Sequence, residues 1–171
     1  MMKIDYIIPT VNRPSLERTK KYIELERVTN ETKPNLIICD KGKCASSNRN
    51  LGLEQVKDSD WIVFVDDDDW LKVGHSKELD KNFDIVVLRM LQGDIKIPRG
   101  CVCPENLWYG NVGINFALQT DFYLKNKIKF QEGKLGEDWL FLRPHLFKTN
   151  KERVKVTKDI FYFAPVSKFK S

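Results

Sequence analysis

Four consecutive aspartates, Asp66 to Asp69, are the strongest chemical feature of this sequence. They follow the apolar run from Trp61 to Val65, whose β-branched and aromatic residues are typical of a buried strand. Carboxylates this close together repel one another unless a cation neutralises them. Their hard oxygen atoms suit Mg²⁺ or Mn²⁺, which usually bind one or two carboxylates together with substrate phosphates. The alternative interpretation is a solvated acidic turn.

Polar residues follow two other apolar runs in the same way. Thr10 and Asn12 come after the run from Ile4 to Pro9, and Asp40 comes after the run from Leu36 to Cys39. The carboxyl ends of parallel strands lie on one edge of a sheet, where α/β proteins bind ligands, so we expect a nucleotide site there. The sequence contains neither G-x-G-x-x-G nor G-x-x-x-x-G-K-[ST], which disfavours a dinucleotide-binding fold and a P-loop.

Two helices are predicted between these strands. The first runs from Pro14 to about Val28, because proline suits the first turn of a helix and the apolar residues recur at helical spacing. The second runs from a cap at Ser46 or Ser47 to Val56. Gly52 costs this helix about 1 kcal/mol relative to alanine, which indicates a close approach of another backbone. Strands and helices that alternate in this way predict a parallel sheet with right-handed crossovers.

The second half of the chain predicts shorter elements. Further strands are expected at Asp84 to Leu88, Ile95 to Pro98, Asn111 to Ala117 and Val154 to Pro165. Helices are expected from Thr120 or Asp121 to Lys125 and from Glu137 onward, where Pro144 should kink or end the helix. The expected fold class is α/β. A single domain over residues 1–171 would have a mostly parallel central sheet flanked by helices, and a smaller mixed β region in its C-terminal half.

The composition, with 42% hydrophobic and 31% charged residues, is ordinary for a soluble globular protein. No apolar run approaches the roughly 20 residues that cross a bilayer, and the first residues do not resemble a signal peptide. We therefore expect a cytoplasmic protein, and we expect no nucleic-acid partner. Disulfides are not expected in a reducing compartment, and C-x4-C and C-x-C spacings disfavour a zinc site; the cysteines are Cys39, Cys44, Cys101 and Cys103.

The net charge of +5 is concentrated at the C-terminal end of the chain. From Lys148 to Ser171, seven Lys or Arg residues outnumber two acids, which leaves 22 bases and 22 acids in the rest of the chain. This basic tail is either a solvated face or a region of peripheral contact with an anionic membrane.

Five motifs, in order along the chain, resemble those of family 2 glycosyltransferases of the GT-A fold. The resemblance covers the first strand and loop, the end of the second strand, the second helix, the acidic strand end and a late acidic pair. These motifs are Ile7 to Pro14, Ile37 to Asp40, Ser47 to Gly52, Phe64 to Trp70 and Gly136 to Trp139. The sequence departs from the family pattern after Asp40, where Lys41-Gly42-Lys43 replaces the usual Gly-Ser.

The resemblance implies an inverting transfer of sugar from a nucleotide sugar, with UDP favoured. It implies that Asp68 binds Mn²⁺ or Mg²⁺, that Asp66 binds the metal or the ribose, and that Asp69 supports them. Asp138 would act as the base with Glu137 beside it, and His145 is a further candidate metal ligand. Residues 1–90 would bind the donor and residues 91–171 the acceptor. The residues expected to contact the donor are Pro9, Thr10, Asn12, Arg13, Asp40, Arg49, Asp66 and Asp67.

The acceptor would be a glycan, a lipid-linked molecule or a protein. Trp70, Trp108 and Tyr109 are candidates for stacking on sugars, with core packing as an equal alternative for Trp70. Two other functions remain open: a module that binds metal and nucleotide sugar without transferase activity, and an Asp-dependent phosphatase. The phosphatase is disfavoured because Asp69 and Trp70 stand where that class has Thr or Val. A sugar nucleotidyltransferase would need an N-terminal Gly-rich loop, which is absent.

Overall fold

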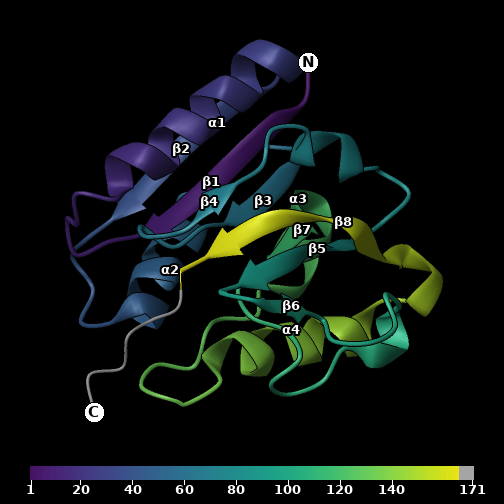
Figure 1. Ribbon diagram of the computed structural model, residues 1–171. Coiled ribbons are helices and arrows are strands. Elements are labelled where there is room, and N and C mark those ends of the chain that lie inside the picture. Colours follow the sequence, from purple (N-terminus) through teal and green to yellow (C-terminus); the bar gives the residue numbers. More distant parts are fainter. Residues whose placement is uncertain (166–171) are drawn as a thin grey trace.

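Strands and helices alternate in the first part of the chain, as the apolar pattern predicts. The structure is a computed structural model, and residues 1–165 are described. The first elements are β1 (Lys3–Pro9), α1 (Leu16–Asn30), β2 (Lys33–Cys39), α2 (Ala45–Leu53) and β3 (Trp61–Phe64) (Figure 1). The predicted order of these elements is confirmed.

The second half combines short strands with two helices and three 3₁₀ turns. Its strands are β4 (Trp70–Leu71), β5 (Ile85–Gln92), β6 (Ile95–Ile97), β7 (Phe116–Gln119) and β8 (Val154–Ala164). Its helices are α3 (Thr120–Asn126) and α4 (Glu137–Lys148), and the turns are η1 (His75–Glu78), η2 (Pro104–Asn106) and η3 (Lys151–Arg153). The sequence pattern did not predict β4 or the 3₁₀ turns.

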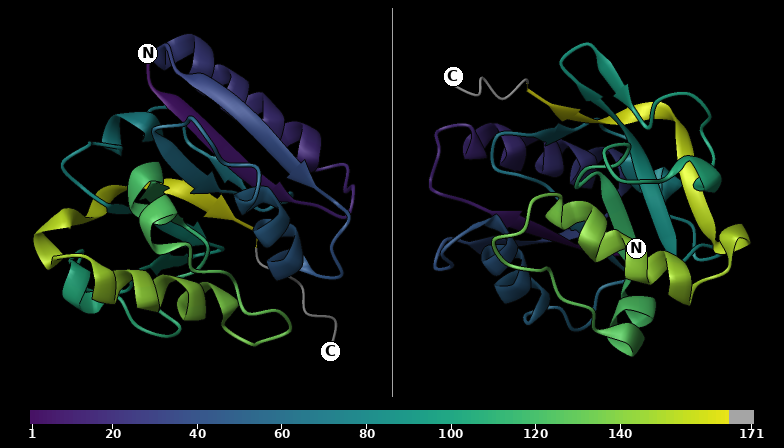
Figure 2. Two further views of the ribbon diagram at one scale, coloured as in Figure 1. Left: turned by 180° about the vertical axis from the view of Figure 1, so that it is seen from behind. Right: turned by 90° about the horizontal axis from the view of Figure 1, so that it is seen from below.

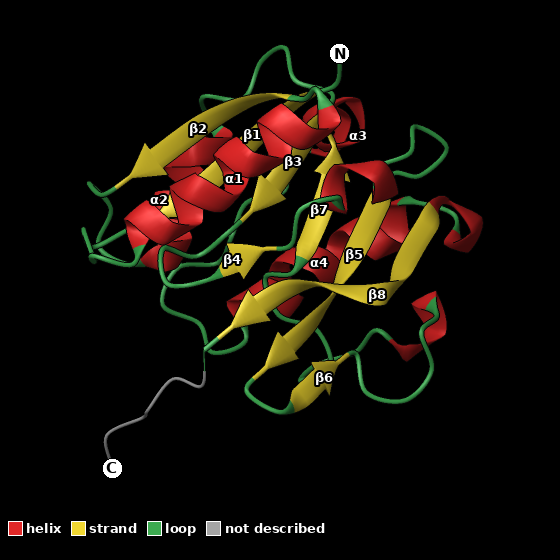
Figure 3. Cartoon of the chain, turned by 45° about the horizontal axis from the view of Figure 1, so that its top comes forward, coloured by secondary structure: helices red, strands yellow, loops and turns green. Residues whose placement is uncertain are grey.

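The strands form one sheet in the order β2-β1-β3-β7-β5-β8-β4, and β6 pairs with β5 beside this path (Figure 3). Strand β1 runs parallel to both β2 and β3. Strand β7 lies antiparallel between β3 and β5, whereas β8 is parallel to β5 and antiparallel to β4. The sheet is therefore parallel in the N-terminal half and mixed in the C-terminal half, which confirms the predicted α/β class.

Side chains of β1 alternate between the two faces of the sheet, so neighbouring residues contact different helices. Tyr6 faces the side covered by α1, where its Oη lies 2.8 Å from Nε2 of the buried His75. Glu26 of α1 is also buried on this side and accepts hydrogen bonds from the backbone amides of Gly74 and Ser76. This polar network fixes η1 against α1 and β1.

The opposite face carries α2 and α4 (Figure 2). Ile7 points toward α2, where its side chain meets Gly52 so closely that an added Cβ would overlap it. This contact confirms the close approach inferred from that glycine. Phe64 of β3 packs edge-on against Phe130 and against Phe141 of α4, and those two rings stack with their centroids 3.8 Å apart.

Some predicted boundaries differ from the structure. Pro144 was expected to kink or end its helix; it does not end α4, which continues to Lys148 because Phe141, Leu142 and His145 maintain its buried face across the proline. The strand expected from Asn111 begins only at Phe116. Asn115 explains part of this difference, because its side chain bonds the backbone amide of Gly113 and the backbone carbonyl of Leu88.

The expectation that the cysteines are free was wrong for one pair. A disulfide joins Cys101 and Cys103, whose Cα atoms lie 5.5 Å apart, whereas Cys39 and Cys44 are free. The expectation rested on the assumption of a reducing compartment. In addition, the C-x-C spacing does not show that the loop brings Cys101 and Cys103 together. Among the described residues, no helix is long and apolar enough to cross a membrane. The predicted basic tail includes Lys168 and Lys170, which lie outside the described residues.

Candidate active site

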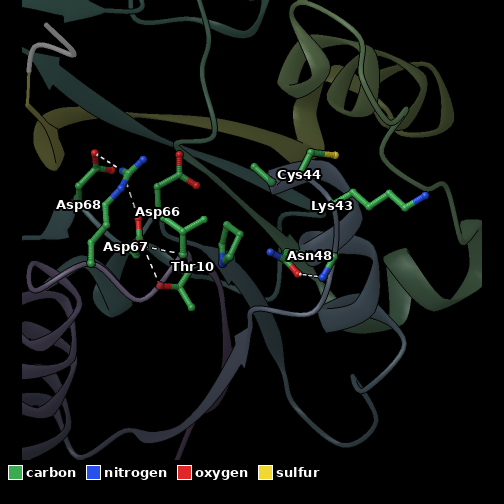
Figure 4. Close-up of a pocket in the computed structure, with 12 residues that line it drawn as sticks. Thr10, Lys43, Cys44, Asn48, Asp66, Asp67 and Asp68 are labelled. Carbon is green, nitrogen blue, oxygen red and sulfur yellow. Dashed lines mark hydrogen bonds and ion pairs between the residues drawn. The ribbon is translucent and has the colours of Figure 1, made fainter.

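A pocket of about 150 Å³ opens at the carboxyl ends of β1 and β3 (Figure 4). This is the sheet edge at which the sequence predicts a nucleotide site. The pocket is bounded by the loop after β1, the acids after β3 and the N-terminus of α2. It is lined by Pro9, Thr10, Val11, Arg13, Gly42, Lys43, Cys44, Ala45, Asn48, Asp66, Asp67 and Asp68. It is smaller than the roughly 300–1,000 Å³ of typical ligand pockets, so it accommodates only part of a nucleotide sugar.

Asp67 ties the loop after β1 to the end of β3. Its carboxylate accepts hydrogen bonds from Thr10 Oγ1 at 2.7 Å and from the Val11 amide at 3.2 Å. Arg13 Nη1 lies 3.3 Å from the other carboxylate oxygen. Only 6% of the Asp67 side chain is exposed, so this residue holds the wall of the pocket together.

Asp68 is the most open of the four acids toward the pocket. Its carboxylate pairs with Arg13 Nη1 at 2.6 Å, and 39% of its side chain is exposed. Arg18 of α1 donates to its backbone carbonyl, also at 2.6 Å, so the main chain is held while the carboxylate remains accessible. Exposed ion pairs contribute about 0–1 kcal/mol, so Asp68 can exchange Arg13 for another cation at little cost.

Arg49 joins the two acidic motifs. Its guanidinium donates to Asp66 at 2.6 Å, to Asp138 at 3.3 Å and to Glu137, and it lies over the Phe130 ring. Burial works against its charge, but the three carboxylates together raise the pKa of Arg49. The predicted role for Arg49 was a contact to the donor. With only 3% of its side chain exposed, Arg49 is better placed to position acids than to reach a ligand.

Asp69 lies in a different environment from its neighbours. Its carboxylate accepts a hydrogen bond from Tyr162 Oη of β8 at 2.7 Å, and Thr19 of α1 donates to its backbone carbonyl. Burial, followed by the charge of Asp66, raises the pKa of Asp69 to about 8. This raised pKa favours the protonated carboxyl at neutral pH, and a protonated, buried carboxyl is poorly suited to bind a cation directly.

The acidic pair Glu137–Asp138 opens α4 beside α2. Ser46 of α2 donates to the Glu137 carboxylate, which Arg49 also contacts. Burial raises the pKa of Asp138 to about 6, against the lowering effect of Arg49. Because 28% of its side chain remains exposed, Asp138 combines access with a pKa close to neutrality. These are the properties of a general base.

The N-terminus of α2 supplies part of the pocket that the sequence predictions did not identify, namely Gly42, Lys43, Cys44 and Ala45. Gly42 has no room for a Cβ beside Ser47 and Asn48, and its amide donates to Asn48 Oδ1 at 2.6 Å. A hydrogen bond from Ser47 lowers the pKa of the Cys44 thiol. The sequence does carry a signal for this part of the pocket, namely a glycine just before a capped helix. Such a segment is a candidate anion site, because helix N-termini attract anions.

Three further predicted site residues neither line this pocket nor bond to its acids. Asp40 lines a separate hollow beside Leu51, Glu54 and Gln55. Asn12 is exposed, has a φ of 60°, and donates its amide to Thr10 Oγ1, so it shapes the loop. His145 is fully buried against Phe122 and Phe141, and burial lowers its pKa to about 4. The buried position of His145 among aromatic rings therefore argues against a role in metal binding.

The acids at the pocket fit a divalent cation that arrives with a ligand. Asp66 and Asp68 have 33% and 39% of their side chains exposed, and each holds its arginine on one carboxylate oxygen. Two carboxylates are what Mg²⁺ takes from a protein when substrate phosphates complete its coordination. Within residues 1–165 no group of three His, Cys, Asp or Glu side chains is arranged to hold a metal alone.

Comparison with solved structures shows that this chain has a GT-A-like glycosyltransferase fold. It superposes on residues 1–349 of S. aureus TarS with a TM-score of 0.63 and 19% identity, covering 96% of this chain and 60% of that one. For the catalytic domain of Drosophila β1,4-galactosyltransferase 7 in complex with xylobiose, the TM-score is 0.60 at 12% identity, covering 100% of this chain and 67% of that one.

A glycosyltransferase involved in glycosylation of the major capsid of PBCV-1 is nearer in size. Its TM-score is 0.50 at 10% identity, and the match covers 100% of this chain and 95% of that one. The chain therefore spans about three-fifths of the TarS structure but nearly all of the viral one. No protein-family model and no curated protein matches the sequence.

Proposed function

We propose that this protein transfers a sugar from a nucleoside-diphosphate sugar to an acceptor hydroxyl. The observation that carries the proposal is the position of Arg49. This buried guanidinium holds Asp66 at the pocket and Glu137–Asp138 at the start of α4, so an acid with a pKa of about 6 lies beside the pocket. The GT-A-like fold supports the same conclusion.

The pocket would bind the diphosphate of the donor. Arg13 and Lys43 are its cationic side chains, and the N-terminus of α2 adds the positive end of the helix dipole; all three suit an anion. Similar proteins were solved with UDP, UDP-GlcNAc and UDP-Gal, which supports a uridine donor. On this proposal, residues 1–90 form most of the donor site, and the later residues form the acceptor side.

Asp66 and Asp68 would hold a divalent cation, with Mn²⁺ or Mg²⁺ as the candidates. When bound, such an ion acts as a Lewis acid that neutralises charge on the diphosphate. Arg13 would then be free to leave Asp68 and contact a phosphate, because the pair it forms with Asp68 is exposed. Arg49 keeps the Asp66 carboxylate oriented toward the pocket.

Asp138 would accept the proton of the acceptor hydroxyl. As that proton moves to the carboxylate, the acceptor oxygen bonds to the anomeric carbon, and the bond from that carbon to the diphosphate oxygen breaks. The diphosphate leaves with the electron pair. Attack from the side opposite the leaving group would invert the configuration at the anomeric carbon.

The test compares the wild type with Asp138→Asn, which keeps the size of the side chain but cannot take the proton. We expect sugar transfer to fall about 10²–10⁴-fold, the usual contribution of a general base. UDP affinity with Mn²⁺, measured by titration calorimetry, should stay unchanged, whereas Asp68→Ala should remove the part of UDP binding that a chelator also removes.

Wild-type turnover in Asp138→Asn would clear Asp138 of this role. Donor binding by the wild type without transfer to any acceptor or to water would instead favour the binding module. If the wild type binds UDP neither with Mn²⁺ nor with a chelator, the proposed donor is wrong.

A further inference from the structure

Two aromatic side chains lie in solvent near the acidic pair. Trp108 and Tyr109 are 50% and 52% exposed, on the loop between η2 and β7. Burial of a large aromatic ring strongly stabilises the folded state. Two adjacent rings that stay half exposed therefore leave part of this stabilisation unused. Neighbouring exposed aromatic residues of this kind are typical of surfaces that bind a partner or ligand.

The loop that carries these rings is held in place by a buried asparagine. Asn111 has no exposed surface, and its amide donates to the carbonyl of Trp108 at 2.9 Å. Its side chain donates to the Asn106 carbonyl and accepts from the Arg99 amide, each at 2.7 Å. The indole nitrogen of Trp108 donates to the Asn106 side chain at 3.3 Å. The rings are therefore positioned before any ligand arrives, which lowers the entropic cost of binding.

The same loop packs directly on the residue that precedes the acidic pair. The ring of Tyr109 lies against Gly136 so closely that a Cβ there would overlap the ring, and Gly136 also has a φ of +70°. Glu137 and Asp138 follow in the chain, and Arg49 connects them to Asp66 at the pocket. The loop that carries the exposed rings is therefore packed against the start of the segment that carries the proposed base.

We propose that Trp108 and Tyr109 form the acceptor subsite and that the acceptor is a carbohydrate, whose sugar ring stacks on these side chains. The proposal rests on the proposed transferase function and specifies its acceptor. Tyr109 packs against Gly136, two residues before Asp138, so a sugar stacked on these rings would lie next to the segment that carries the proposed base.

The chemistry of the surface favours a sugar over a lipid chain or an apolar peptide. A pyranose offers a face of C–H groups to an aromatic ring and a rim of hydroxyls to polar neighbours. The rings here have such neighbours in Asn106 and the carbonyl groups that it bonds. A lipid chain needs a continuous apolar groove to cover it, whereas Trp108, Tyr109 and Leu135 are each at least half exposed.

The experiment measures the acceptor specificity of the full chain in the presence of UDP and Mn²⁺. Binding of cellobiose, chitobiose, xylobiose and lactose is followed by saturation-transfer NMR and by tryptophan fluorescence, with a polyprenyl phosphate and a serine peptide as the other acceptor classes. At least one disaccharide should bind. Trp108→Ala and Tyr109→Ala should each weaken that binding about tenfold, because stacking on an aromatic ring is lost.

Two further variants separate stacking from general damage. Tyr109→Phe keeps the ring and should restore most of the affinity lost in Tyr109→Ala. Phe147→Ala removes an aromatic ring that is 76% exposed at the far end of α4 and should leave disaccharide binding unchanged. UDP affinity reports on the fold and on the donor site in every variant.

The proposal is overturned if the wild type binds UDP but no disaccharide, or if a disaccharide binds equally well to the alanine variants. It is also overturned if only the lipid phosphate or the peptide binds. In each of these cases intact UDP binding would preserve the proposed donor function, whereas loss of UDP binding in the wild type would remove both.

Discussion

Replacing Asp69 by asparagine should stabilise the ligand-free protein, although Asp69 belongs to the most acidic stretch of the chain. Its carboxyl group is buried and has a pKa of about 8, against an ordinary value of 3.8. A carboxyl whose pKa is raised in the folded state favours folding while it is protonated. Stability is therefore lost as the pH rises from about 4 toward 8. Asparagine does not titrate and can still accept the hydrogen bond from Tyr162.

The size of the effect follows from the shift. Between the unfolded pKa of 3.8 and the folded pKa of about 8, each pH unit lowers the free energy of unfolding by about 1.36 kcal/mol. At pH 7 the ionisable carboxyl of Asp69 therefore lowers the free energy of unfolding by about 4 kcal/mol. At pH 4 the same relation leaves less than about 1 kcal/mol. For a chain of this length 1 kcal/mol moves Tm by about 2–4 °C, so Asp69→Asn should raise Tm by roughly 10 °C at pH 7 and hardly at pH 4.

The assay is thermal and urea unfolding with a chelator present, at pH 4 and pH 7. Asp67→Asn is the matched control, because it makes the same chemical change two residues away. The Asp67 carboxylate accepts from Thr10, Val11 and Arg13, so an amide nitrogen there would face a donor and cost about 1–3 kcal/mol. If Asp69→Asn lowers Tm as Asp67→Asn does, or shifts Tm equally at both pH values, the assignment of a protonated Asp69 is wrong.

Two other substitutions test the packing that supports the site. Arg49→Met leaves three carboxylates without their buried counter-charge. It should lower the free energy of unfolding, measured in urea, by about 3–5 kcal/mol. A loss below about 1 kcal/mol would contradict the role of Arg49. Gly52→Ala should destabilise by about 1–3 kcal/mol although alanine favours helices, because its Cβ overlaps Ile7; increased stability would show that Ile7 can move aside.

The sequence was sufficient to predict β1, β2, β3 and the helices between them. Strands covered on both faces leave continuous apolar runs, and the helices between them begin at recognisable caps. The acidic end of β3 was correctly expected on the carboxyl edge of the sheet. These features are local in sequence, so no knowledge of distant contacts was needed.

The differences among the four aspartates could not be predicted in this way. Their partners lie far away in the chain: Arg49 is 17 residues from Asp66, and Tyr162 is 93 residues from Asp69. The sequence pattern around these four residues gave no reason to expect that Asp69 is buried. The displacement of Asp40 from the pocket was missed for the same reason, since only the path of the loop after β2 determines where its side chain lies.

The position of β8 in the sheet affects how the site is built during synthesis. Strand β8 is the last described element of the chain, yet it lies between β5 and β4 rather than at an edge. It also supplies Tyr162, the hydrogen-bond donor to Asp69. Proteins are synthesised from the N-terminus onward, so β4 and β5 leave the ribosome before β8. Until β8 follows, the strand edges of β4 and β5 that pair with β8 have no hydrogen-bond partner. A chain that stalls or is cut before Val154 would carry every acid of the site and still lack the strand that holds β4 in the sheet.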